Sequence, residues 1–297
     1  MIDSGSTLLV GVDGGGTGCR AAIGTVADGI LAHAESGPAN ATSDPVLAIK
    51  NITLAVTAAA QVLGISIGAL RAVTTHVGLV GIMNKQDVER VKSSLHYGDM
   101  SVTDDRPTAV KGALGDEFGF VLSVGTGTIA ASYTSDGLKC VGGWGFQLSD
   151  RGSGAWLGRA ALENVLLCYD GIGEHSPLTR NLLSKFNSDP NQIVAFGSKA
   201  TAADLAKLAR DIVERANSGD PWGRVMMQTG AEHLVHALNG LGFVTGNRLC
   251  LTGGVGPHYA KYLPDEFLAG YTAPLGTALD GAFALAQAKS ALSKGTP

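Results

Sequence analysis

The sequence has few of the residues that mark several common classes of protein. Its four cysteines, Cys19, Cys140, Cys168 and Cys250, lie far apart and form no Cys-x-x-Cys pair. This spacing is not that of a disulfide framework or a structural zinc site, and it favours a reducing compartment, which we expect to be the cytoplasm. No run of Lys or Arg exceeds two residues, and the formal net charge is -4. We therefore expect no nucleic-acid partner and no membrane partner.

Long apolar runs and targeting signals are also scarce. We find no apolar stretch that looks long enough to span a bilayer, and no basic region ahead of an apolar one at the N-terminus. Hydrophobic residues still make up 45% of the 297 residues, which is enough to bury a full core. Glycine is abundant, at 42 residues in clusters, so we expect tight turns and places where the backbone approaches a ligand.

Short apolar runs alternate with helical patterns, which predicts an α/β fold. We expect strands at 8–12, 19–23, 72–80, 100–103, 120–124, 129–133 and 248–252. We expect helices at 46–63, 87–96, 153–169, 177–186, 202–217, 221–241 and 275–292. A strand, a glycine turn and a second strand occur at 8–23 and again at 120–133, which indicates two similar halves. The predicted domains are residues 1–115 and 116–274, with a C-terminal helix within 275–297 packing back on the first.

Glycine-rich turns follow three of the predicted strands, at 13–18, 125–128 and 253–256. Glycine lets backbone N–H groups face phosphate oxygens, and ligands of open α/β folds bind at strand ends. None of these turns has the spacing of a P-loop or of a dinucleotide fingerprint, and each alone could equally be a tight hairpin. Asp13, at a strand end, is suited to hold Mg²⁺ through water beside phosphates, or simply to cap its turn.

Four segments together resemble the N-acetylglucosamine kinase branch of the BadF/BadG/BcrA/BcrD ATPase family, within the actin, sugar-kinase and heat-shock chaperone superfamily. They are 13–17 (Asp-Gly-Gly-Gly-Thr), 125–128 (Gly-Thr-Gly-Thr), 142–145 (Gly-Gly-Trp-Gly) and 150–153 (Asp-Arg-Gly-Ser). The resemblance covers nearly the whole chain. It implies two actin-like (ribonuclease H-like) domains with an interdomain cleft, and a cytoplasmic homodimer. It also implies an enzyme that uses ATP and Mg²⁺ to phosphorylate the 6-hydroxyl of N-acetylglucosamine, with glucosamine as the alternative acceptor.

The resemblance also implies roles for particular residues. Phosphates would bind at Gly15, Gly16, Thr17, Thr126, Gly127 and Thr128, adenosine at Gly253 and Gly254, and the sugar at Asn40, Asp105, Trp144, Gly145 and Asp150. One position departs from the family pattern. Animal members carry Asn directly after their Gly-Thr-Gly-Ser turn, where it helps to bind the sugar, and this chain has Ile129. The preference at the 2-position of the sugar is therefore open.

Phosphoryl transfer to a sugar hydroxyl needs a carboxylate that accepts the hydroxyl proton. The family places this aspartate at the end of a strand, before a helix, and here Asp104 and Asp105 both fit. The spacing to residues 112–114 favours Asp105, with Asp104 as the alternate. Either acid could instead cap the following helix.

Several candidate residues also have purely structural interpretations. Asn40 could be a turn residue, Asp150 could cap the helix that begins near Ser153, and Trp144 could belong to the core. His233 and His236 lie three apart on a predicted helix, but no third ligand accompanies them, so we do not predict a metal site.

Other classes of function remain as alternatives. An ATPase activator of an acyl-CoA dehydratase would need cysteines for an iron–sulfur cluster, and Cys140 and Cys168 lie outside any such motif. The ROK kinase branch carries a cysteine-rich zinc motif that is absent from this sequence. A sugar- or nucleotide-sensing module would lack a functional base, which the acids at 13 and 105 argue against.

Overall fold

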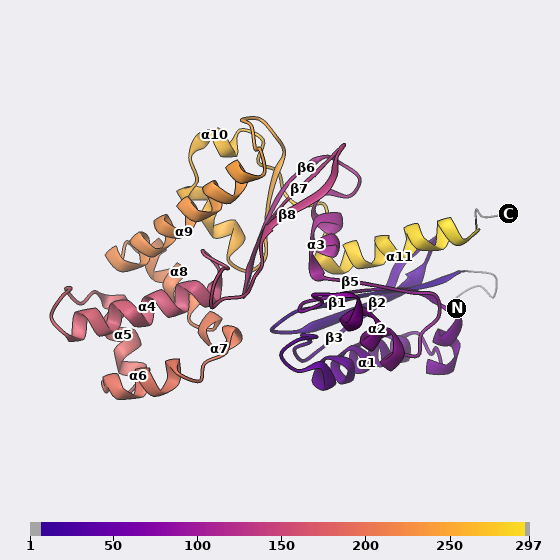
Figure 1. The fold of residues 1–297 in the computed structure, drawn as a ribbon, viewed down its shortest axis with the longest axis horizontal. Coiled ribbons are helices and arrows are strands. Elements are labelled where there is room, and N and C mark those ends of the chain that lie inside the picture. Colours follow the sequence, from indigo (N-terminus) through magenta and orange to yellow (C-terminus); the bar gives the residue numbers. More distant parts are fainter. Residues whose placement is uncertain (1–6, 295–297) are drawn as a thin grey trace. The chain divides into compact units, whose positions relative to one another are not determined.

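The computed structural model describes residues 7–294, and the chain divides into two compact units (Figure 1). Unit 1 runs up to Glu117 and resumes at Pro274, and unit 2 comprises Phe118–Ala273. Each unit contains one mixed sheet with its own helices, which confirms the predicted α/β class.

The sheet of unit 1 has the strand order β3-β2-β1-β4-β5. Its strands are β1 (Leu8–Gly14), β2 (Cys19–Thr25), β3 (Gly29–Ser36), β4 (Thr74–Leu79) and β5 (Met100–Thr103). β2 is antiparallel to both β1 and β3, and β4 is parallel to both β1 and β5. The carboxyl ends of β1, β3, β4 and β5 therefore lie at one edge of the sheet.

Helices cover both faces of this sheet. They are α1 (Pro45–Val62), α2 (Lys85–Ser94), α3 (Asp105–Leu114) and α11 (Ala278–Lys294), with a 3₁₀ turn at Ile67–Ala72. α1 packs on β2 and β3, whereas α11 packs on β1, β2, β4 and α3. Successive side chains of β1 point to opposite faces of the sheet. Val10 packs in the core under α1, and Leu9 packs in the core under α11.

α1 begins as its sequence predicts, with Asp44 accepting a hydrogen bond from the N–H of Leu47 and Pro45 as the first helical residue. Contrary to our expectation from the sequence, α1 is long and apolar enough to cross a membrane by length and composition alone. Its buried side, which includes Ile52 and Val56, packs into the core of unit 1. The buried apolar residues of α1 are thus accounted for by its packing as a core helix.

α3 and α11 approach so closely that glycine is required where they cross. A Cβ atom on Gly281 would lie 2.0 Å from the carbonyl oxygen of Thr108, and one on Gly112 would lie 1.9 Å from the carbonyl oxygen of Thr277. The obstructing atoms belong to the backbone, which cannot move aside as a flexible side chain can. The position of α3 thus depends directly on α11.

Unit 2 repeats the strand arrangement of unit 1, with the order β8-β7-β6-β9 in place of β3-β2-β1-β4. Its strands are β6 (Gly119–Val124), β7 (Thr128–Thr134), β8 (Gly137–Gly142) and β9 (Leu249–Thr252). Its helices are α4 (Gly154–Tyr169), α5 (Pro177–Lys185), α6 (Pro190–Gly197), α7 (Ala202–Ala206), α8 (Ala209–Asn217), α9 (Pro221–Gly240) and α10 (Asp265–Leu268), with a 3₁₀ turn at Gly256–Tyr262. β6, β8 and β9 are parallel, so their carboxyl ends also share one edge.

The prediction of one helix over 202–217 is wrong. The chain turns at Lys207 and Leu208, which separates α7 from α8. The turn lets the chain pack closely on α4, where a Cβ on Gly158 would lie 2.1 Å from the carbonyl oxygen of Leu205. Helical periodicity continues across the turn, so the sequence does not reveal it. We also did not predict β3, β8, α6, α10 or the 3₁₀ turns.

Candidate active site

The candidate residues of unit 1 come from distant parts of the chain and gather at the carboxyl edge of its sheet. Asp13 is the last residue but one of β1, the loop with Asn40 follows β3, and Asp104 and Asp105 follow β5. Ligands of open α/β sheets bind in the crevice outside the carboxyl ends of the strands.

The glycine turn after β1 is a tight hairpin into β2. The N–H of Gly15 donates to the carbonyl of Gly18 at 2.8 Å, and the carbonyl of Gly15 accepts from the N–H of Ala39 at 2.9 Å. Gly15 and Gly16 are partly exposed and Thr17 is exposed, so the predicted phosphate-binding residues of this turn are accessible to a ligand.

Asp13 is a buried acid at the end of β1, with 7% of its surface exposed. Arg20 lies directly opposite it on β2, and Nη2 of Arg20 is 3.0 Å from Oδ2 of Asp13. Burial raises the pKa of Asp13, and the charge of Arg20 opposes that rise only in part. One carboxylate oxygen of Asp13, Oδ2, is therefore held by Arg20.

Asp104 and Asp105 have different environments, although they are neighbours. Asp104 caps α3 by accepting from the N–H of Arg106 at 2.9 Å, and its two oxygens also accept from Nε and Nη2 of Arg106 at 2.8 and 2.7 Å. Burial alone would raise the pKa of Asp104, but the hydrogen bonds from Arg106 outweigh burial and lower it. Asp104 is thus the helix cap that the sequence allowed for.

Asp105 is the first residue of α3 and is partly exposed. Burial raises the pKa of Asp105 to about 6, and the negative charges of Asp104 and Asp13 add to that rise. The influence of Asp13 indicates that the ends of β1 and β5 bring these acids close together. A carboxylate with a pKa near 6 is suited to accept a proton at neutral pH.

Asn40 has the turn role that its sequence allows. Its Oδ1 accepts from the N–H groups of Thr42 at 2.9 Å and Ser43 at 3.0 Å. Since an amide oxygen has two acceptor directions, both are occupied by the loop. The carboxamide NH₂ remains as the group that Asn40 offers to a ligand, so it would act as a donor and not as an acceptor.

The glycine turns of unit 2 lie side by side at the carboxyl edge of its sheet. The N–H of Gly125 donates to the carbonyl of Gly127 at 2.9 Å, which forms the turn between β6 and β7. Gly253 has a φ of +79°, and a Cβ there would lie 2.4 Å from the carbonyl oxygen of Val124. Only glycine fits this contact, which brings the turn after β9 against the end of β6.

Asp150 lies between the turns at 125–128 and 142–145. Its backbone has a φ of +54°, and a Cβ on Gly127 would lie 2.9 Å from its Oδ2. Burial raises the pKa of Asp150, although the backbone N–H groups of Thr128, Gly145 and Gly143 act to lower it. Asp150 does not cap α4, because the side chain of Ser153 does so by accepting from the N–H of Trp156 at 3.1 Å.

Three buried oxygens of unit 2 have no hydrogen-bond partner among the described residues: Oγ1 of Thr128, Oδ1 of Asp150 and Oγ1 of Thr252. All three lie at or next to the glycine turns. Leaving a buried polar atom unpaired costs about 1–3 kcal/mol, so such atoms are typical of places where a ligand completes the bonding.

Trp144 is not a core residue, since 72% of its surface is exposed. It stands between Gly143 and Gly145, which have φ values of +74° and +94°. Ile129 lies beside this turn, because a Cβ on Gly143 would be 3.5 Å from its Cγ1. An apolar side chain therefore occupies the place next to the predicted sugar-binding turn.

Arg20 and Arg106 were not among the residues predicted from the sequence, yet they set the charge around Asp13 and Asp104. Arg106 directly follows the two candidate acids, which was an available signal. Predicting the role of Arg20 would have required the register of the β1–β2 hairpin, which pairs Arg20 with Asp13.

Comparison with known protein families assigns the chain to one of them. The profile of the BadF/BadG/BcrA/BcrD ATPase family matches residues 10–263. The chain belongs to this family. The family membership predicted from the glycine turns and the Gly-Gly-Trp-Gly segment is therefore confirmed.

Individual proteins are similar to this chain over almost their whole length. The glucosamine kinase GspK of Vibrio cholerae serotype O1 is 30% identical over 278 residues, which are 93% of this chain and 95% of that protein. The N-acetylmuramic acid/N-acetylglucosamine kinase of Clostridium acetobutylicum is 28% identical over 273 residues, covering 87% and 88%. A crystal structure from Chromobacterium violaceum, with a provisional N-acetylglucosamine kinase name, superposes with a TM-score of 0.88 at 31% identity, covering 95% and 99%.

Proposed function

We propose that this protein is an ATP-dependent amino-sugar kinase that transfers the γ-phosphoryl group to the 6-hydroxyl of N-acetylglucosamine, with glucosamine as the alternative acceptor. The observation that carries the proposal is Asp105, whose pKa is raised to about 6 at the strand edge that also holds Asp13 and the first glycine turn. The kinase names of similar proteins support the reaction class.

Asp105 is the proposed catalytic base. Its carboxylate accepts the proton of the sugar hydroxyl as that oxygen bonds to the γ-phosphorus of ATP, while the bond from this phosphorus to the β–γ bridging oxygen breaks and ADP leaves. Asp104 cannot easily take this part, because Arg106 binds both of its oxygens. In unit 1, the NH₂ of Asn40 is the proposed donor to a sugar oxygen. In unit 2, the proposed sugar contacts are Trp144, Gly145 and Asp150.

The chain offers suitable groups for nucleotide phosphates and magnesium. We propose that Gly15, Gly16 and Thr17 in unit 1, and Thr126, Gly127, Thr128, Gly253 and Gly254 in unit 2, bind the nucleotide. Mg²⁺ supplies charge neutralisation on the phosphates when it is bound with ATP. Oδ1 of Asp13 fits a hard cation, through water, since Oδ2 is held by Arg20. The unpaired hydroxyl of Thr128 fits a phosphate oxygen.

We further propose a cytoplasmic homodimer in which the two units are the two domains of a sugar kinase. Among the described residues, the cysteines at 19, 140, 168 and 250 form no disulfide bond with one another, which suits a reducing compartment.

A coupled assay of ADP release tests the proposed function. We expect ATP turnover with N-acetylglucosamine or glucosamine, less with glucose and N-acetylmannosamine, and very little without a sugar. Phosphorus NMR of the product would locate the phosphate on the 6-hydroxyl. Turnover that is equal with and without sugars would contradict the proposal, and so would inactivity with every one of them.

The two neighbouring acids make a separate prediction about pH. Asp104→Asn should move the acid limb of the kcat/KM profile to lower pH by about one unit, because it removes a negative charge beside Asp105 and frees Arg106. Asn still caps a helix well, so α3 should persist. Asp116→Asn changes an exposed acid just beyond α3 and is the control. It should leave the acid limb of the kcat/KM profile at its wild-type pH. An unchanged limb in Asp104→Asn would mean that Asp105 is not the titrating base.

A further inference from the structure

The loop that carries Asn40 (residues 37–44, hereafter the Asn40 loop) is bound on several sides. Its hydrogen bonds are from the N–H of Ala39 to the carbonyl of Gly15 (2.9 Å), from the N–H of Ala41 to the carbonyl of Val80 (2.8 Å) and from Nδ2 of Asn51 to the carbonyl of Pro38 (2.6 Å). These bonds fix the first half of the loop to the end of β4, to α1 and to the first glycine turn. The second half depends on other groups.

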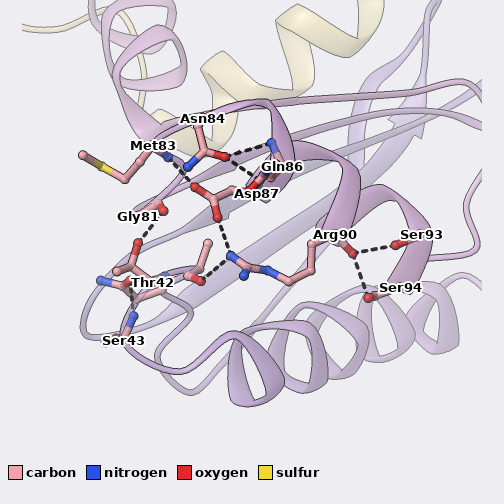
Figure 2. A network of polar contacts seen from close by, with 12 residues as sticks. Thr42, Ser43, Gly81, Met83, Asn84, Gln86, Asp87, Arg90, Ser93 and Ser94 are labelled. Atoms are coloured by element: carbon pink, nitrogen blue, oxygen red, sulfur yellow. Dashed lines mark hydrogen bonds and ion pairs between the residues drawn. The ribbon is translucent and has the colours of Figure 1, made fainter.

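Arg90 on α2 holds the loop directly after Asn40. Its Nη2 donates to the carbonyl of Ala41 at 3.1 Å and forms an ion pair with Oδ1 of Asp87 at 2.5 Å (Figure 2). The other oxygen of Asp87 accepts from the N–H of Met83 at 3.0 Å. Asp87 and Arg90 (hereafter the Asp87–Arg90 clamp) therefore join α2, the loop after β4 and the Asn40 loop.

Figure 2 shows a second link between the same two loops, in which Oγ1 of Thr42 donates to the carbonyl of Gly81 at 2.6 Å. The N–H of Thr42 also donates to Oδ1 of Asn40. A displacement of Ala41 or Thr42 would therefore change the direction of the Asn40 carboxamide, although neither Asp87 nor Arg90 touches Asn40 itself.

Capping of α2 does not explain the clamp. Asn84 already caps this helix by accepting from the N–H groups of Gln86 at 2.8 Å and Asp87 at 3.1 Å. Asp87 is 9% exposed, but 45% of the Arg90 side chain is exposed, and an ion pair that water screens on one side contributes little net stability. What this pair does provide is a fixed direction for the Arg90 guanidinium toward the carbonyl of Ala41.

We propose that Asp87 and Arg90 are positioning residues for sugar binding, which set the Asn40 carboxamide by holding the main chain at Ala41. This inference rests on the proposed kinase function. Without the clamp, the Asn40 loop would spend a smaller fraction of the time in the conformation that binds the sugar. The apparent affinity for the sugar would fall in proportion to that fraction. Phosphoryl transfer from the bound complex would be little changed, since Asp105 and the glycine turn lie on other strands.

Steady-state kinetics test the clamp. In Arg90→Gln we expect the KM for the amino sugar to rise about 3- to 10-fold, with kcat and the KM for ATP within about 2-fold of wild type. Arg90→Lys keeps the charge opposite Asp87 and should recover part of the sugar affinity. Lys92→Gln is the matched control on the same helix, because Lys92 pairs only with the exposed Glu89 in the ion pairs of the described residues. A sugar KM unchanged in Arg90→Gln, or both KM values raised equally, would overturn the proposal.

Hydrogen exchange of the ligand-free protein separates this inference from the proposed function. Arg90→Gln should speed exchange at the amides of Ala41, Thr42 and Ser43, while the amides of β1 keep their wild-type protection. Unchanged exchange in the loop would overturn the clamp and leave the kinase assignment intact. Faster exchange in a protein that phosphorylates no sugar would overturn the proposed function, and the sugar-positioning role with it.

Discussion

Asp105→Asn should lower kcat by roughly 10²–10⁴-fold while nucleotide binding persists, because the amide cannot accept the proton of the sugar hydroxyl. Asn has nearly the shape of Asp, and Asp104 still caps α3, so the site should keep its geometry. Single-turnover kinetics with saturating sugar, together with titration of a fluorescent ATP analogue, measure the two effects separately. Asp104→Asn is the matched control and should retain most of the wild-type kcat at neutral pH. If Asp105→Asn turned over normally, the assignment of the base would be wrong.

The same variant should be more stable than the wild type above pH 6. The folded pKa of Asp105 is about 6, above the ordinary value of 3.8, so folding takes up protons between these values. The charged carboxylate therefore costs stability at pH 7.5, and this cost disappears as pH falls through 6 toward 4. Since the side chain is partly exposed, we expect a gain on the order of 1–2 kcal/mol. Urea unfolding at pH 7.5 and pH 4.5 should show a clearly larger gain at the higher pH.

Gly281→Ala should destabilise unit 1 by about 3 kcal/mol or more. The added methyl group would lie 2.0 Å from the carbonyl oxygen of Thr108 and 2.5 Å from the N of Gly112, both in the backbone of α3. α11 must then move away from α3, which loosens the helix that begins at Asp105, so kcat should fall as well. Thermal and urea unfolding measure the loss of stability.

Gly240→Ala is the matched control for this prediction, since it is the same change in a helix. A Cβ on Gly240, at the end of α9, would meet no atom within 4 Å. Alanine favours helix over glycine, so this variant should be as stable as the wild type or slightly more stable. If both variants behaved alike, the close approach of α3 and α11 would not be a constraint on the protein in solution.

Local signals in the sequence predicted much of the fold and the segments that form the candidate site. Asp44-Pro45 marked the start of α1, and the apolar run into Asp13-Gly14 marked a strand and its turn. Short-range chemistry determines these features, because a cap or a hairpin turn needs only its own neighbours. The glycine turns also led to the correct family.

The spacing in the sequence favoured Asp105 over Asp104, but the pKa shifts of individual acids could not be read from it, because they depend on surroundings built by distant segments. Asp104 and Asp105 are adjacent, and the pKa values of their carboxyl groups differ because burial raises that of Asp105, with the charges of Asp104 and Asp13 adding to the rise, whereas hydrogen bonds from Arg106 lower that of Asp104. The same holds for the break between α7 and α8, which reflects packing on Gly158 and leaves no mark on helical periodicity. Packing and burial, and not helix propensity, determine the different pKa values of the two acids and the position of the helix break.

The return of α11 to unit 1 has a consequence for synthesis on the ribosome. Unit 2 is one continuous segment, whereas unit 1 needs α11, which is translated after the whole of unit 2. Until then the face of the first sheet with Leu9 and Ala22 lacks its helix and stays apolar and open. Unit 2 can thus complete its core before unit 1 does, so the half of the protein that is made first should finish folding last. Nascent chains halted before residue 278 should bind chaperones through this open face.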